Sequence, residues 1–236
     1  MNSSKKSILN SNFTYLAAFV LPVIMMMALY YTRGIFPWGN ECYLRSDMYH
    51  QYAPFFSELW HKIRNGESLT YSWNIGMGTN FTSLFAYYLA SPSNWFVALF
   101  PQKYTIEIMN AFIILKIAGS SLSLTYYLTK HNNNKHVIAA IFGMFYGMSG
   151  FIAAYSWNIM WLDCVILIPL IMLGLERLVN ENRCIFYCIT LGLCIFTNYY
   201  IAIMVCLSVV IYYVVLMIAY NGIKSPMQYV LSLIHI

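Results

Sequence analysis

The fold is decided first by an apolar run, FTYLAAFVLPVIMMMALYYT, which extends from Phe13 to Thr32. A helix needs about 20 mainly apolar residues to cross the hydrocarbon core of a bilayer, and this run has that length without a charged side chain. Lys5 and Lys6 precede the run, as in a secretory signal peptide. Because no cleavage-site pattern of small residues follows it, we interpret the run as an uncleaved first membrane span.

The composition of the chain extends this interpretation to the whole protein. Of the 236 residues, 60% are hydrophobic and 9% are charged, whereas a soluble domain carries roughly 25% charged residues. The apolar runs do not alternate with polar residues, as the strands of a membrane barrel would. We therefore predict an all-α polytopic membrane protein and not an unusually apolar soluble one. The net charge of +5 comes from basic residues spread over the loops, which indicates no nucleic-acid partner.

Six apolar runs reach or approach the length of a membrane span. We predict spans at residues 13–32, 105–128, 137–155, 162–178, 184–198 and 200–220. The last two divide one long run near the residues TNYY, 197–200, and residues 33–104 form a long loop after the first span. Another apolar segment opens after Pro226 and stops at Ile236. We therefore expect the chain to be the N-terminal part of a longer transmembrane domain, truncated at its C-terminus.

The distribution of lysine and arginine predicts the orientation, because cytoplasmic loops carry an excess of both. The short loops YSWNIMW, 155–161, and TNYY contain neither residue. The segments on the other side contain Lys5, Lys6, Lys130, Lys135, Arg177, Arg183 and Lys224. We therefore predict a cytoplasmic N-terminus and an extracytoplasmic loop 33–104.

The long loop contains a predicted amphipathic helix from Met48 to Ile63. Apolar residues recur with helical spacing at Met48, Tyr52, Phe55, Leu59 and Ile63. The polar residues that we expect to lie largely off this stripe are Gln51, Glu58, His61, Lys62 and Arg64. Asn65 and Gly66 follow as a helix stop. Such a helix is typical of a segment that lies along a membrane surface.

Two carboxylates mark the outer ends of predicted spans. Asp47 lies just beyond the first span, and Asp163 opens the fourth. Either could have a purely structural role, since an Asp at a helix N-terminus caps the helix or interacts favourably with its dipole. The functional alternative is a pair at the outer membrane face. One carboxylate would act as general base on an acceptor hydroxyl, and the other would orient the substrate or share a divalent metal with the first.

Lys116 lies near the middle of the second predicted span, where a lysine costs about 2.5–3.5 kcal/mol on insertion scales. We expect it to face the bundle, either in a buried pair, or snorkelling, or as a cation that stabilises a lipid phosphate. His50 and His61 are not in an H-E-x-x-H pattern, and the six cysteines show no C-x-x-C spacing. These residues therefore predict no zinc site.

Several stretches together resemble the bacterial YfhO family of membrane proteins. They are RSDMYHQYAPFFSELWHKIRNGESLTYSWNIGMGTNF (45–81), AYYLASPSNWF (86–96), LKIAGSSLS (115–123), WLDCVILIPLIMLGLERL (161–178) and TNYYIAIMV (197–205). That family is similar to the GT-C class of polytopic glycosyltransferases. The resemblance implies a GT-C-like helical bundle with a large first extracytoplasmic loop, in the bacterial cytoplasmic membrane. It also implies sugar transfer from a polyprenyl-phosphate donor to an envelope acceptor such as teichoic acid. The partners that it implies are this donor, this acceptor and the surrounding membrane lipids.

The resemblance also implies roles for particular residues. Asp47 matches the key acidic residue that follows the first span in GT-C enzymes, and Asp163 is the candidate for a second one. No D-x-D pattern occurs at Asp47, so a divalent metal is not implied there. The residues expected to bind the donor or the acceptor are Arg45, His50, Gln51, Tyr52, Trp73, Asn74, Tyr87, Tyr88 and Lys116.

Two other functions are compatible with the sequence. A transporter or lipid flippase would account for Lys116 and the bundle, but not for the polar, glycine-punctuated loop. A non-catalytic scaffold of envelope assembly predicts that substitutions at Asp47 and Asp163 are silent.

Overall fold

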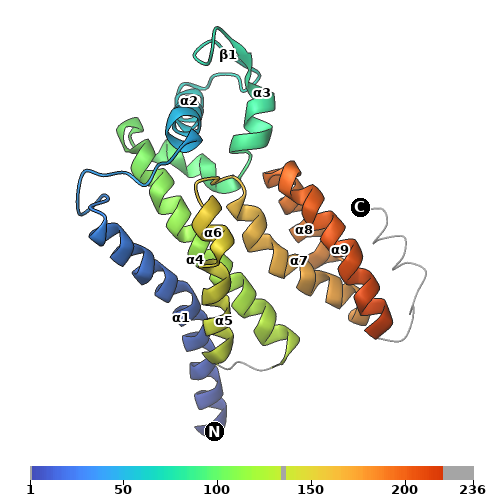
Figure 1. Ribbon diagram of the computed structural model, residues 1–236. Coiled ribbons are helices and arrows are strands. Elements are labelled where there is room, and N and C mark those ends of the chain that lie inside the picture. The colour runs from blue at the N-terminus through green and yellow to red at the C-terminus, as the bar shows by residue number, and fades with distance from the viewer. Residues whose placement is uncertain (1, 134–136, 220–236) are drawn as a thin grey trace.

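The computed structural model describes residues 2–133 and 137–219, and these residues form a helical bundle with a small loop layer at one end (Figure 1). The helices of the bundle are α1 (Asn2–Thr32), α4 (Thr105–His131), α5 (Val137–Gly147), α6 (Gly150–Tyr155), α7 (Leu162–Glu181), α8 (Ile185–Thr197) and α9 (Tyr199–Ala219). A helix therefore occupies each of the six predicted spans. The apolar segment after Pro226 lies outside the described residues, as do Lys135 and Lys224.

Within the described residues, four helical segments are long and apolar enough to cross a membrane, judged by length and composition. They are Asn12–Thr32, Gln102–His131, Val137–Tyr155 and Tyr199–Ala219. α8 is apolar but has only 13 residues. α7 has 20 residues and carries Asp163 in its first turn and Glu176, Arg177 and Glu181 toward its other end. The prediction of an all-α membrane protein is confirmed, and the count of six spans stays a prediction.

The third predicted span is interrupted. α5 ends at Gly147 and α6 begins at Gly150, so the helix breaks at Met148 and Ser149. α5 packs closely against α4, because a Cβ on Gly147 would lie 2.8 Å from the carbonyl oxygen of Ile117. The break therefore occurs directly after a close contact between the two helices, which come closer still at Gly143, where a Cβ would clash with the carbonyl oxygen of Ser121.

α4 is the central helix and packs against α1, α5 and α7, while α7 also packs against α8 and α9. Small hydroxyl residues make several of these contacts. The Ser121 hydroxyl donates to the carbonyl of Ala18 in α1 (2.6 Å), and the Thr125 hydroxyl donates to the carbonyl of Ala139 in α5 (3.3 Å). Interfaces between membrane helices are enriched in such small residues, which let the backbones come close.

The predicted amphipathic helix is present. The π-helical turn η1 (Met48–Tyr52) continues into α2 (Ala53–Asn65), which ends at Gly66 in the left-handed conformation (φ 68°). Met48, Tyr52, Phe55 and Leu59 of the predicted stripe are buried. In Figure 1, α2 is seen almost along its axis and lies across the end of the bundle.

The polar side of α2 differs from the sequence prediction. Glu58 and Lys62 are only 6% and 3% exposed, although the sequence places them off the apolar stripe. The reason is a hairpin of β1 (Tyr71–Ser72) and β2 (Thr79–Asn80), whose chain folds back over this side of α2. Both sides of the helix are therefore covered by protein.

Candidate active site at the loop end of the bundle

The candidate site lies at the loop end of the bundle, the end that carries residues 33–104 and 156–161. Asp47 begins η1 with an exposed side chain, and no hydrogen bond or ion pair to its carboxylate occurs within residues 2–133 and 137–219. Arg45 and His50 flank it and are also exposed. Burial raises the pKa of Tyr52, and the negative charge of the nearby Asp47 raises it further. Asp47 is thus a free carboxylate beside a tyrosine that stays protonated.

The connecting loop (residues 156–161) is tied to the first long loop by two tyrosine hydroxyls. Tyr52 donates to Oδ1 of Asn158 (2.9 Å), and the hydroxyls of Tyr43 and Ser156 are 2.7 Å apart. The other side of the connecting loop is held by Lys116, whose ammonium donates to the carbonyl of Ile159 (3.1 Å). The connecting loop therefore links residues 43–52, here called the Asp47 segment, to the interior of the bundle.

Lys116 and Asp163 form an ion pair. Nζ of Lys116 lies 2.7 Å from Oδ2 of Asp163, and the two side chains are 5% and 15% exposed. Asp163 is in the first turn of α7. Of the alternatives for Lys116, the geometry corresponds to the buried pair, so a lipid phosphate would have to compete with Asp163 for this cation. The Asp163 carboxylate is therefore paired with a cation, whereas no described cation pairs with the Asp47 carboxylate.

Aromatic rings gather beside Asp47. The ring centroid of Tyr52 lies 5.4 Å from that of Tyr88 and 6.3 Å from that of Trp157. The ring centroids of Tyr87 and Tyr88 are 4.6 Å apart. The Gln51 amide donates to the Tyr88 hydroxyl (3.2 Å). The structure therefore brings together four of the predicted binding residues, Gln51, Tyr52, Tyr87 and Tyr88. Flat aromatic faces of this kind can stack against a sugar ring.

Two polar groups at this site were not predicted from the sequence. Asn158 is 2% exposed, and its Nδ2 has no hydrogen-bond partner among the described residues; the same holds for Nε1 of Trp161. Unsatisfied buried donors are rare and call for an explanation such as a missing ligand or water. The sequence feature that could have indicated them is Asn158 between Trp157 and Trp161, in the loop before Asp163.

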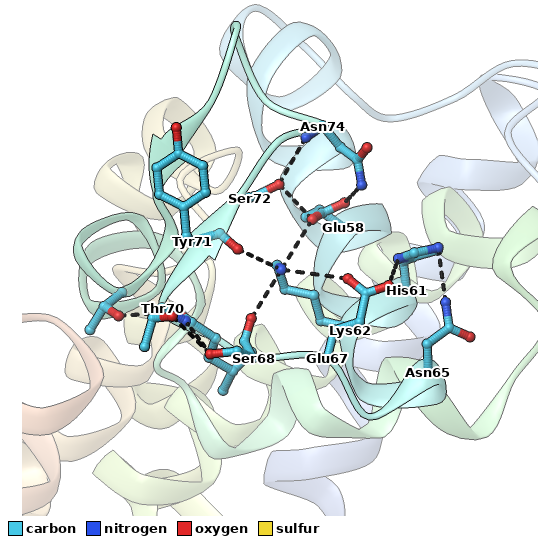
Figure 2. Close-up of polar contacts among 12 residues, drawn as sticks. Glu58, His61, Lys62, Asn65, Glu67, Ser68, Thr70, Tyr71, Ser72 and Asn74 are labelled. Atoms are coloured by element: carbon cyan, nitrogen blue, oxygen red, sulfur yellow. Dashed lines mark hydrogen bonds and ion pairs between the residues drawn. The ribbon is translucent and has the colours of Figure 1, made fainter.

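The remaining predicted binding residues, Trp73 and Asn74, lie on the hairpin, and Figure 2 shows Asn74 beside Glu58 and Ser72. Trp73 is 78% exposed and its ring packs edge-on against Tyr71. The Asn74 amide donates to Oε2 of Glu58 (3.0 Å). Asn74 therefore has a structural partner within the loop layer, and no described contact joins either residue to the Asp47 segment.

The Glu58–Lys62 cluster attaches the hairpin to α2. The Glu58 carboxylate accepts from the Ser72 hydroxyl (2.6 Å), and the Lys62 ammonium donates to the carbonyls of Ser68 (3.0 Å) and Tyr71 (2.8 Å). Burial favours the neutral acid, but the hydrogen bonds and the nearby cations outweigh it and hold the pKa of Glu58 below its usual value. The buried Glu58 and Lys62 side chains thus both have hydrogen-bond partners, as buried polar groups that stabilise structure have to.

A divalent metal finds no donor set in the part of the chain that the structure describes. No group of three or more His, Cys, Asp or Glu side chains there could hold a metal ion. The six cysteines are all free thiols.

The sequence of the chain matches one known protein family over most of its length. The family described as "Bacterial membrane protein YfhO" matches residues 17–236. The chain belongs to the YfhO family. The match covers every described helix except the beginning of α1, so the YfhO assignment includes both the Asp47 segment and the Lys116–Asp163 pair. No curated protein and no solved structure matches this YfhO-family chain.

Proposed function

We propose that this YfhO-family protein transfers a sugar from a polyprenyl-phosphate donor to an acceptor in the cell envelope, such as teichoic acid, at the extracytoplasmic membrane face. The observation that carries the proposal is the free Asp47 carboxylate beside a cluster of tyrosines at the loop end. A general base must be ionised and within reach of the proton that it takes. Asp47 is available to an acceptor, since its side chain is exposed and no described side chain binds its carboxylate.

In the proposed reaction, Asp47 accepts the proton of the acceptor hydroxyl. The hydroxyl oxygen then forms a bond to the anomeric carbon of the sugar, and the bond from that carbon to the phosphate oxygen breaks. Polyprenyl phosphate leaves with the electron pair, and Arg45 and His50 stabilise its charge. Tyr87 and Tyr88 stack on the sugar.

Asp163 and Lys116 act as positioning residues in this proposal. Their pair holds the start of α7 and, through the carbonyl of Ile159, the connecting loop. Through Asn158 and the Tyr52 hydroxyl, that loop in turn holds η1, the turn that Asp47 begins. A loss of the pair is therefore expected to lower the transfer rate by misplacing Asp47, not by removing a reacting group.

The experiment is a transfer assay in membranes that contain the protein. A radiolabelled polyprenyl-phosphate sugar is added with envelope polymer, and label in the polymer is measured against membranes without the protein. Label that depends on the protein supports the proposal. A YfhO-family protein that is present and folded but transfers no label from any polyprenyl-phosphate sugar contradicts it.

Transport is the second candidate function, because the Lys116–Asp163 pair is the kind of ionisable group that marks transport paths between membrane helices. A transporter predicts substrate flux across a sealed vesicle without any covalent product. Flux that requires Lys116 and occurs without labelled polymer would favour it.

A further inference from the structure

A lateral groove opens on the bundle between α1, α4 and the break between α5 and α6. It has a volume of about 240 Å³ and lies at the loop end. Its apolar lining residues include Met26, Leu29, Ile117, Met148 and Ile152. The helix break contributes Met148, and the glycine before the break allows α5 to approach α4 at the base of the groove.

The mouth of the groove is basic. Arg33 follows α1, Arg45 lies in the long loop, and both line the groove with exposed side chains. Within the described residues, neither arginine pairs with a carboxylate, and no acidic side chain lines the groove. An arginine pair without a counter-ion is suited to a phosphate, which its planar guanidinium groups bind through paired hydrogen bonds.

A third polar group points to a ligand. Tyr30 lines the groove and is 2% exposed, yet its hydroxyl has no hydrogen-bond partner among the described residues. A buried hydroxyl without a partner costs free energy that a bound oxygen atom would recover. The neighbouring wall is fixed, because the hydroxyls of Tyr43 and Ser156 bond to each other across the two loops.

We propose that this groove binds the polyprenyl phosphate part of the donor. The isoprenoid chain enters sideways from the membrane onto the apolar wall, and Arg33 and Arg45 hold the phosphate. This inference rests on the proposed function and adds Arg33, Tyr30 and the α1–α6 groove to the site. The groove is smaller than the roughly 300–1,000 Å³ of typical ligand pockets, so it would enclose only the part of the isoprenoid chain next to the phosphate.

The arrangement also connects the groove to the chemistry. Arg45 lies two residues before Asp47, so a phosphate held at Arg45 places the sugar beside the proposed general base. The tail, phosphate and sugar would then follow one path from the membrane to the tyrosines.

The test is photolabelling of the full chain in phosphatidylcholine nanodiscs with a benzophenone-bearing polyprenyl phosphate, which carries no sugar. Two changes remove the site: Ala153→Trp, which fills the groove from an exposed lining position, and the double variant Arg33→Ala with Arg45→Ala. The matched controls are Ala154→Trp, an exposed position next along α6 that does not line the groove, and Arg64→Ala on α2. We expect labelled peptides from α1 and α6, at least tenfold less label in both site variants, and unchanged label in both controls.

Equal labelling of the site variants and the wild type would overturn the proposal, and so would an equal loss in the controls. Competition by phosphatidylglycerol as effective as that by unlabelled polyprenyl phosphate would also overturn it, because the groove would then hold bulk lipid. The assay separates the groove from the reaction. Sugar transfer that persists in both site variants refutes the groove alone, whereas groove-dependent labelling without transfer from any donor refutes the proposed function alone.

Discussion

The buried ion pair between Lys116 and Asp163 makes a prediction that can be worked from the structure. At an effective dielectric constant of about 20, two unit charges 2.7 Å apart attract each other by roughly 6 kcal/mol. Much of this attraction offsets the cost of removing both ions from water. Removing one partner leaves the other as an uncompensated buried charge, which costs about 3–5 kcal/mol. Lys116→Met and Asp163→Asn should each destabilise the protein by about that amount.

The pair interaction is isolated by the double variant. With both charges gone, no uncompensated ion remains, so the double variant should be less destabilised than the sum of the single variants by up to about 3 kcal/mol. Thermal unfolding in detergent, followed by tryptophan fluorescence, measures the three variants, and Lys103→Met on an exposed lysine is the control. Because surface substitutions usually change stability by less than about 0.5 kcal/mol, the control should unfold like the wild type.

Additive effects of the two single substitutions would refute this reasoning. So would a Lys116→Met variant that unfolds like the wild type. The second result, together with a loss of transfer, would mean that Lys116 serves a substrate phosphate and that the pair with Asp163 contributes little to the fold.

Three further predictions concern the loop layer and the helix packing. Because the folded-state pKa of Glu58 is lowered, its carboxylate should stabilise the fold above its usual pKa of 4.5 and lose this contribution as the pH falls through the folded-state pKa. Glu58→Gln should therefore be less stable than the wild type at pH 7, with a deficit that shrinks below about pH 4.5 in unfolding scans; a pH-independent deficit would contradict the assignment. Tyr52→Phe should cost about 1 kcal/mol and increase amide hydrogen exchange in the connecting loop, and unchanged exchange would contradict the link. Gly174→Ala should destabilise the protein by about 1–3 kcal/mol, since a Cβ there would lie 2.7 Å from Cα of Tyr187, whereas Gly192→Ala meets nothing within 4 Å and should be neutral or stabilising.

The helices of the bundle could be predicted from the sequence because their signal is local. Apolar length alone located them, and helical spacing located the amphipathic segment from Met48 to Ile63, which the structure extends to Asn65. The break at Met148 was missed, although the glycines at 147 and 150 around it were a visible signal. Hydropathy averages over such a break, since the residues on both sides are apolar.

The contacts that build the site could not be predicted, because they join distant parts of the chain. Lys116 and Asp163 are 47 residues apart, and Tyr52 and Asn158 are 106 apart. Glu58 was expected off the buried stripe, because helical spacing cannot show that the hairpin folds back over the polar side of α2. Polar and charged residues in an apolar chain, such as Lys116 and Asp163, could be singled out from the sequence. Their partners became known only from the structure.

The proposed role of Asp47 as the base of a sugar transfer is tested by comparing Asp47→Asn with Glu41→Gln in the transfer assay. Both substitutions neutralise an exposed carboxylate of the same loop, and neither removes a described side-chain partner. We expect Asp47→Asn to unfold like the wild type but to lower the transfer rate by at least 10²-fold, the scale of general-base catalysis, while Glu41→Gln transfers sugar at the wild-type rate. Full transfer by Asp47→Asn would show that Asp47 is not the general base.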